Sequence, residues 1–279
     1  MLLRLPAAIG RAFLVVVLIV MPSALLSGGM EDAAHIIVLV ALFAALFTFV
    51  EYVSVSPSLV EFRDAPPFNR MRFSALFAMV LCVSMIFRGY QIPSDMTGLF
   101  QASGEQIGQV IDFPYSPVRL LVLTILDDVN PELVALMRDA AGLSYLIALL
   151  SIVSFILLLR LRRWPLRGGA FNVWVNLPTF DPNAGGDVVE RLQKDAKFNI
   201  ILGFLLPFLV PAALMLLSYL GAPVNLASPL TLIWMVTAWA YLPASIVMRG
   251  VALSRVADMI AAQREKSRGF DATREWRLP

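Results

Sequence analysis

Residues 199–248 read NIILGFLLPFLVPAALMLLSYLGAPVNLASPLTLIWMVTAWAYLPASIVM and contain no aspartate, glutamate, lysine or arginine. The turn-forming sequence Gly221-Ala222-Pro223-Val224-Asn225 divides this stretch into two apolar blocks. A helix needs about 20 apolar residues to cross a bilayer, and each block is long enough. The stretch therefore predicts two membrane-spanning helices joined by a short turn.

Similar apolar blocks recur toward the N-terminus. The six predicted spans are residues 13–26, 33–53, 73–87, 141–159, 199–220 and 226–248. Across the whole chain 59% of the 279 residues are hydrophobic and 15% are charged, whereas a soluble domain has roughly 45–50% apolar and about 25% charged residues. We therefore predict an all-α, polytopic integral membrane protein with six transmembrane helices in one membrane domain.

The basic residues predict how the chain is oriented. Of the 22 lysine and arginine residues, all but Arg88, Arg119 and Arg138 lie in the N-terminal flank, the 54–72 connection, the 160–198 loop, the tail 249–279, or at span ends adjoining them. The connections on the other side are otherwise free of positive charge. Because basic loops stay on the cytoplasmic side, both termini are predicted to be cytoplasmic.

The first apolar block has two interpretations. Arg4 and Arg11 precede it, as basic residues precede the apolar region of a cleaved signal peptide. No A-x-A cleavage site follows the block, so we expect it to be an uncleaved membrane anchor.

The exterior segment 88–140 carries three helix-start patterns. From Ser94 the apolar residues recur at three- and four-residue steps, which predicts an amphipathic helix capped by that serine. Ser116-Pro117 predicts a second helix, and Asn130-Pro131-Glu132 a third that could continue into the fourth span. Two interpretations stay open, a helical cap on the outer membrane surface and a docking platform for a partner.

The cytoplasmic loop 160–198 is the least regular part of the chain. Residues 171–177 alternate in a partly strand-like way, residues 178–186 are rich in turn formers, and Asp187 with Glu190 predicts a capped helix leading into the fifth span. The aromatic residues of the loop, including Trp164, are typical of a membrane interface. The loop is either structural and bound at that interface, or a docking site for a partner or lipid. The candidate docking residues are Phe171, Trp174, Phe180, Asp181 and Asp187.

The tail 249–279 continues the sixth span with a moderate amphipathic stripe and becomes mostly polar beyond Ser267. We expect its end to be ordered only by a partner or by the membrane surface.

Ionisable residues are missing from the middle of every predicted span. His35 and Glu51 lie near the two ends of the second span, where interfacial water can solvate both; alternatively, Glu51 pairs with a basic residue such as Arg72. A single cysteine, Cys82, allows no intrachain disulfide, and a single histidine allows no multi-histidine metal or haem site. Coupled carriers and intramembrane hydrolases need such groups at membrane depth. We therefore expect no enzyme activity, catalytic residue, cofactor or metal.

Prolines are the remaining unusual feature inside the spans. Pro22, Pro207, Pro211 and Pro243 each remove a backbone donor and are predicted to kink their helices. Such kinks either shape helix packing or line a cavity.

These observations favour a non-catalytic accessory, assembly or scaffold protein of a larger membrane complex. The alternative is an uncoupled channel or carrier for a small or amphipathic solute, lined by the proline-bearing fifth and sixth spans. The expected partners are membrane lipid and other membrane-protein subunits. Nucleic acid is disfavoured by the net charge of only +2, and nucleotide by the lack of a G-x-x-x-x-G-K-[ST] sequence. The short, compact loops suggest the bacterial inner membrane.

Overall fold

The computed structural model describes residues 5–26, 31–124, 130–162, 164, 172–181, 185–221 and 228–275. Every regular element in those ranges is a helix, as the sequence predicts. In chain order the helices are α1 Leu5–Leu25, α2 Glu31–Val53, α3 Phe68–Gln91, α4 Asp95–Ile111, α5 Pro117–Leu123, α6 Pro131–Arg162, α7 Val173–Asn176, α8 Val188–Tyr219 and α9 Pro229–Glu275.

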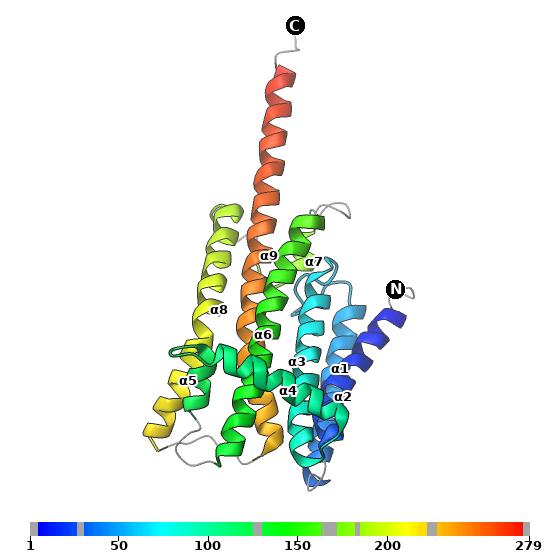
Figure 1. The fold of residues 1–279 in the computed structure, drawn as a ribbon. Helices are drawn as coiled ribbons and strands as arrows, with labels where there is room; N and C mark the ends of the chain where they lie inside the picture. Colours follow the sequence, from blue (N-terminus) through cyan, green and yellow to red (C-terminus); the bar gives the residue numbers. More distant parts are fainter. Residues whose placement is uncertain are drawn as a thin grey trace.

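Six of these helices, α1, α2, α3, α6, α8 and α9, are long and apolar enough to cross a membrane. They contain the six predicted apolar blocks almost entirely, and most extend beyond them because good helix formers continue into the polar flanks. The protein is therefore a multi-pass membrane protein. Both termini lie at the same end of the bundle (Figure 1), which is hereafter the inner end because its charge predicts that it is cytoplasmic.

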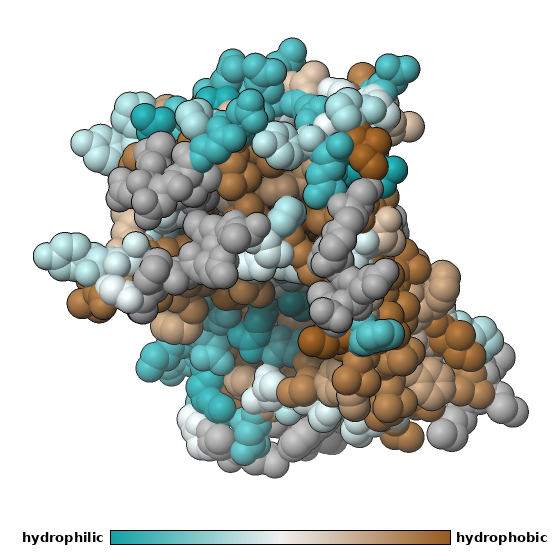
Figure 2. Space-filling model, turned by 90° about the horizontal axis from the view of Figure 1, so that it is seen from below, coloured by the Kyte–Doolittle hydropathy of each residue, from teal (hydrophilic) through white to brown (hydrophobic). Residues whose placement is uncertain are grey.

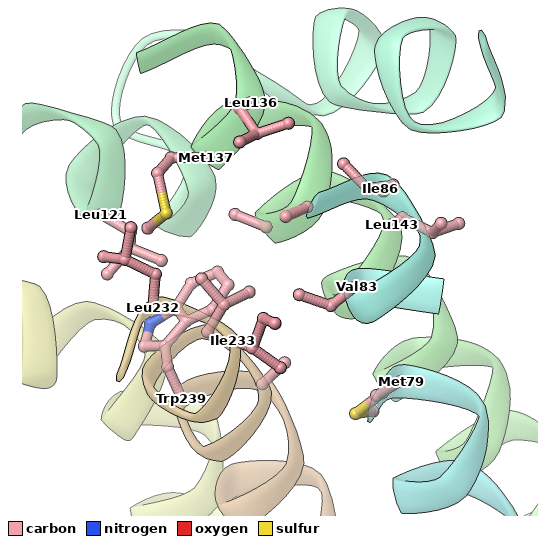
Figure 3. Packing of buried hydrophobic residues seen from close by; sticks show 14 of the residues in the cluster. Met79, Val83, Ile86, Leu121, Leu136, Met137, Leu143, Leu232, Ile233 and Trp239 are labelled. Atoms are coloured by element: carbon pink, nitrogen blue, oxygen red, sulfur yellow. The ribbon is translucent and has the colours of Figure 1, made fainter. Parts of the chain in front are cut away.

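The spans form a bundle in which α1 packs on α2 and α3, α3 packs on α6 and α9, and α9 also packs on α6 and α8 (Figure 1). The outer half of the bundle contains a buried apolar cluster, the outer core, contributed mainly by α3, α5, α6 and α9 (Figure 3). Its members include Met79, Val83, Leu121, Met137 and Ile233. Because lipid tails are as apolar as these side chains, close packing rather than removal from water holds such helices together.

The exterior helices begin where the sequence predicts. At α4 the Ser94 hydroxyl accepts from the Thr97 backbone N–H at 3.2 Å, and the Thr97 hydroxyl accepts from the Ser94 N–H at 2.9 Å. Ser116 caps α5, and α6 runs without a break from Pro131 to Arg162.

Helix α4 crosses in front of α3 and α6 in Figure 1, and glycines permit the crossing on α6. A Cβ placed on Gly142 of α6 would lie 2.5 Å from the Cα of Gly108 in α4. Seen from the outer end, hydrophilic residues gather along the upper edge and toward the lower left, and a broad hydrophobic surface covers the lower right (Figure 2).

The four prolines lie inside helices that continue through them, Pro22 in α1, Pro207 and Pro211 in α8, and Pro243 in α9. Pro211 has no N–H, so the Pro207 carbonyl lacks its usual helical donor. The Trp239 indole N–H of α9 donates to that carbonyl at 3.0 Å instead. The prolines of α8 therefore take part in the contact with α9. The expected bends of the helices at the four prolines stay a prediction.

One sequence-based expectation is wrong. The strand-like residues 173–176 form one turn of helix, α7, capped by the Asn172 side chain, which accepts from the Val175 N–H at 3.4 Å. A strand needs a neighbouring strand to satisfy its backbone, and the described residues provide none. The tail is helical as far as Glu275, and the ordering of its end by a partner or the membrane surface stays a prediction.

Candidate functional site at the inner end

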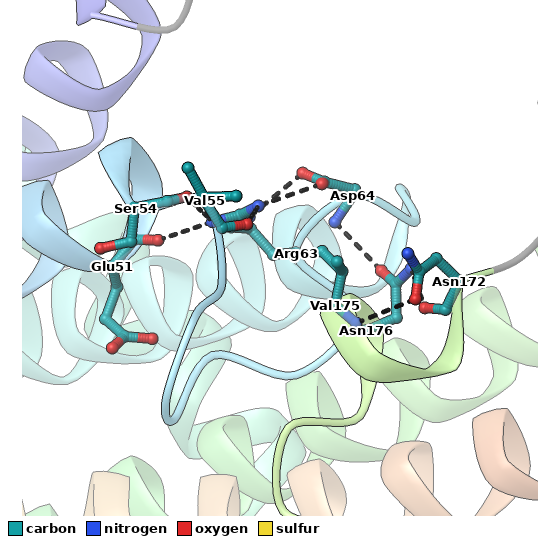
Figure 4. A network of polar contacts seen from close by, with 8 residues as sticks. All are labelled: Glu51, Ser54, Val55, Arg63, Asp64, Asn172, Val175 and Asn176. Atoms are coloured by element: carbon teal, nitrogen blue, oxygen red, sulfur yellow. Dashed lines mark hydrogen bonds and ion pairs between the residues drawn. The ribbon is translucent and has the colours of Figure 1, made fainter. Parts of the chain in front are cut away.

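The connection between α2 and α3 is held by two charged side chains (Figure 4). The Glu51 carboxylate accepts from the backbone N–H groups of Ser58, Leu59 and Val60 at 3.0–3.1 Å, and from the Ser58 hydroxyl. The predicted pairing of Glu51 with Arg72 is therefore wrong. Donors from residues seven to nine positions along the chain occupy both carboxylate oxygens of Glu51. Neither oxygen is therefore left to accept from a more distant arginine.

Arg63 supports the same connection from inside. Its guanidinium donates to the carbonyls of Glu51 at 3.0 Å, Ser54 at 2.6 Å and Val55 at 3.2 Å, and it pairs with Asp64 at 3.2 Å. These carbonyls belong to the last turn of α2 and to the two residues after it, where helical carbonyls lose their intrahelical donors. The Arg63 side chain is only 2% exposed, so it acts as a buried cap of α2.

The two connections at the inner end bind each other across the sequence. The Asn176 carbonyl accepts from the Phe62 N–H at 2.6 Å, and its side-chain oxygen accepts from the Asp64 N–H at 3.1 Å (Figure 4). Glu61 then pairs with Arg249 of α9 at 2.6 and 2.8 Å. The 54–67 and 172–181 segments and α9 therefore form one assembly.

Beneath these polar contacts lies a second apolar cluster, the inner core. The Phe62 ring centroid lies 4.6 Å from that of Phe68 and 5.7 Å from that of Trp164. The other buried members are Ala65, Phe155, Leu159, Leu177, Phe180, Leu192, Ala196, Met248, Ala252, Leu253, Val256 and Ala257. This cluster makes the inner end a packed structure and not merely a set of flexible links.

The predicted docking residues differ in whether the structure describes them and in how far they are buried. Phe171 and the Trp174 side chain lie outside the described residues, although the Trp174 backbone belongs to α7. Phe180 is only 8% exposed and packs in the inner core, with the Arg191 guanidinium 4.7 Å from its ring centroid. This burial supports the structural interpretation for Phe180, and the docking role of the loop stays a prediction.

The two acidic candidates are exposed. The Asp181 carbonyl accepts from Arg191 at 2.9 Å. The Asp187 carboxylate accepts from the Val189 N–H at 3.0 Å, confirming the predicted cap of α8, and pairs with Arg264 of α9 at 2.6 Å. Because Asp187 and Arg264 are each about half exposed, their ion pair contributes little stability.

A cavity of about 960 Å³ opens between α1, α2 and α3 at the inner end. Its polar lining includes Arg11, Arg63, Arg70 and Arg72, and its walls include apolar residues of α1 and α3 together with Tyr241 of α9. Sequence reasoning missed this site. The arginines at the inner ends of the first and third spans were its only signal, and their convergence depends on how α1 packs against α3.

The inner end therefore contains a packed apolar core, a capped helix end and a cavity lined by arginines. Among the residues that the structure describes, no group of three or more histidine, cysteine, aspartate or glutamate side chains could hold a metal ion. No protein-family model, curated protein or solved structure matches this chain.

Proposed function

We propose that the protein is a non-catalytic accessory, assembly or scaffold subunit of a larger complex, in the bacterial inner membrane, and that helix α9 contacts a partner subunit there. The observation that carries the proposal is the length of α9. This helix runs from Pro229 to Glu275 and projects well beyond the inner ends of the other spans (Figure 1).

Residues 262–267 of the projecting part bury no apolar face against the part of the chain that the structure describes. Residues 262–267 are exposed at every position around the helix, whereas Val256 and Ala257, about two turns earlier, belong to the inner core. A helix that is polar on all sides bridges between domains, is stabilised by many i,i+4 side-chain pairs, or is not stable by itself. A partner that packs along this projection would supply the stabilisation that the chain itself does not.

Close packing of α8 on α9 favours this proposal over a channel or carrier lined by those two helices. A Cβ on Gly203 of α8 would lie 2.8 Å from the Pro243 carbonyl oxygen, and a Cβ on Gly250 of α9 would lie 2.8 Å from the Ala196 carbonyl oxygen. The two backbones are thus in contact at two levels. A solute path along this face would require them to separate.

The test is a proline placed where α9 leaves the inner core. Ala262→Pro interrupts the helix at a cost of about 3 kcal/mol, and Ala262→Ser is the matched control. After mild-detergent extraction, we expect the unaltered chain and Ala262→Ser to purify with a stoichiometric partner, and Ala262→Pro to insert but lose that partner. The proposal is overturned if the unaltered chain purifies alone, or if Ala262→Pro keeps the same partner at the same stoichiometry.

A further inference from the structure

We propose that the cavity between α1, α2 and α3 is a binding site for one anionic phospholipid. Its phosphate would lie among Arg11, Arg70 and Arg72, and its acyl chains would follow the apolar wall toward the membrane interior. This site is independent of the proposed partner contact on α9.

The charge of the cavity selects an anion. Four arginines line it, and no aspartate or glutamate does. The Arg63 guanidinium is occupied by the carbonyls that follow α2 and by Asp64. In contrast, Arg11, Arg70 and Arg72 form no ion pair with any described residue. Three uncompensated cations around one cavity attract a negatively charged group.

Two of these arginines lie against aromatic rings. The Arg11 guanidinium lies 4.5 Å from the Tyr52 ring centroid, and the Arg72 guanidinium lies 5.1 Å from that of Phe68. The Arg72 Nε atom is buried and has no hydrogen-bond partner among the described residues. The ring contacts limit the positions that the two guanidinium groups can take beside the cavity.

The walls select an amphiphile instead of a free anion. Leu14 and Val15 of α1, and Phe73 and Leu76 of α3, lie one turn or less beyond the arginines toward the membrane interior. Tyr241 of α9, which belongs to the predicted sixth span, also lines the cavity. A cationic end that leads into an apolar wall fits a lipid headgroup followed by its acyl chains. The volume of about 960 Å³ lies near the top of the range of about 300–1,000 Å³ that is usual for ligand pockets.

Two variants test the site by different means. Arg70→Gln with Arg72→Gln removes two cations, and Arg160→Gln, an exposed arginine at the inner end outside the cavity, is the control. Gly10→Phe fills the space without removing charge, because a Cβ on this lining residue meets nothing within 4 Å. Gly10→Ala is its control.

The measurement is the amount of phosphatidylglycerol or phosphatidylcholine that stays bound to the purified protein, read by native mass spectrometry. We expect the unaltered chain to retain phosphatidylglycerol selectively. Each arginine removed should weaken retention about fivefold, the effect of one cation near an anionic headgroup. Gly10→Phe should also lose the lipid, and both controls should retain it.

The proposal is overturned if the unaltered chain holds both lipids equally, or if the double arginine variant and Gly10→Phe retain phosphatidylglycerol as their controls do. Inorganic phosphate provides the remaining arm. If millimolar phosphate displaces the lipid or raises the melting temperature as much as the lipid does, the site recognises a free anion and the lipid assignment is wrong. Arg70 is exposed and forms no ion pair with a described residue, so Arg70→Gln alone repeats the charge test should the double variant fail to fold.

Discussion

Replacing Trp239 by phenylalanine would test how α9 completes the backbone hydrogen bonding of α8. The substitution removes the indole N–H that reaches the Pro207 carbonyl at 3.0 Å. A net hydrogen bond contributes about 0.5–1.5 kcal/mol, and interhelical hydrogen bonds in one membrane protein averaged about 0.6 kcal/mol with a maximum of about 1.7 kcal/mol. The smaller ring also leaves a packing defect beside Tyr145, whose ring stacks on Trp239 with centroids 5.7 Å apart.

A double-mutant cycle with Pro211→Ala separates the hydrogen bond from the packing. Alanine at this position restores an N–H four residues after Pro207, so the carbonyl regains an intrahelical donor. We expect Trp239→Phe to destabilise the Pro211→Ala background by about 1 kcal/mol less than the unaltered background. Unfolding in mixed micelles of a mild detergent and sodium dodecyl sulfate measures both costs. Equal costs in the two backgrounds would refute the view that Trp239 replaces the donor lost at Pro211.

Gly142→Leu should separate α4 from α6, because a Cβ there would lie 2.5 Å from the Gly108 Cα. Protease cleavage of the exterior segment should then accelerate, whereas Gly98→Leu, where a Cβ meets open space, should behave as the unaltered chain does; equal cleavage of the two variants would contradict the packing argument. Reporter fusions should place Ser103 outside, and Asp64 and the C-terminus in the cytoplasm, as the basic residues predict. A cytoplasmic signal at Ser103 would be incompatible with six spans.

The helix boundaries show which local signals are decisive. Ser94, Ser116 and Asp187 cap the helices that they were expected to begin, because each cap depends only on residues two or three positions away. The same kind of reasoning was wrong for residues 171–177. Their alternation describes a strand, but a strand also requires a partner elsewhere in the chain, and no local pattern reports whether one exists.

The candidate sites were harder to predict for the same physical reason. The sequence makes Glu51 a candidate for an ion pair with Arg72, because both lie near the inner end. The fold of the 54–67 segment instead brings three N–H groups to the carboxylate. Phe180 was a docking candidate on its aromatic character, yet it fills the inner core. An aromatic residue in a loop has the same sequence signature whether it faces a partner or the interior.

The sequence by itself determined that the protein lies in a membrane and crosses it with six helices. It also predicted the side on which each helix end lies and the residues that cap the helices. Hydropathy, charge asymmetry and cap chemistry are properties of short segments, so they can be recognised without knowledge of the fold. Only the tertiary structure decided which spans are neighbours. It placed Asn176 against Phe62, Gly142 against Gly108, and the arginines of α1 and α3 around one cavity. All six spans are apolar enough to contact lipid, so hydrophobicity alone does not select among possible neighbours. That selection depends on close packing between small residues and on a few buried polar contacts, which exist only once the helices have met.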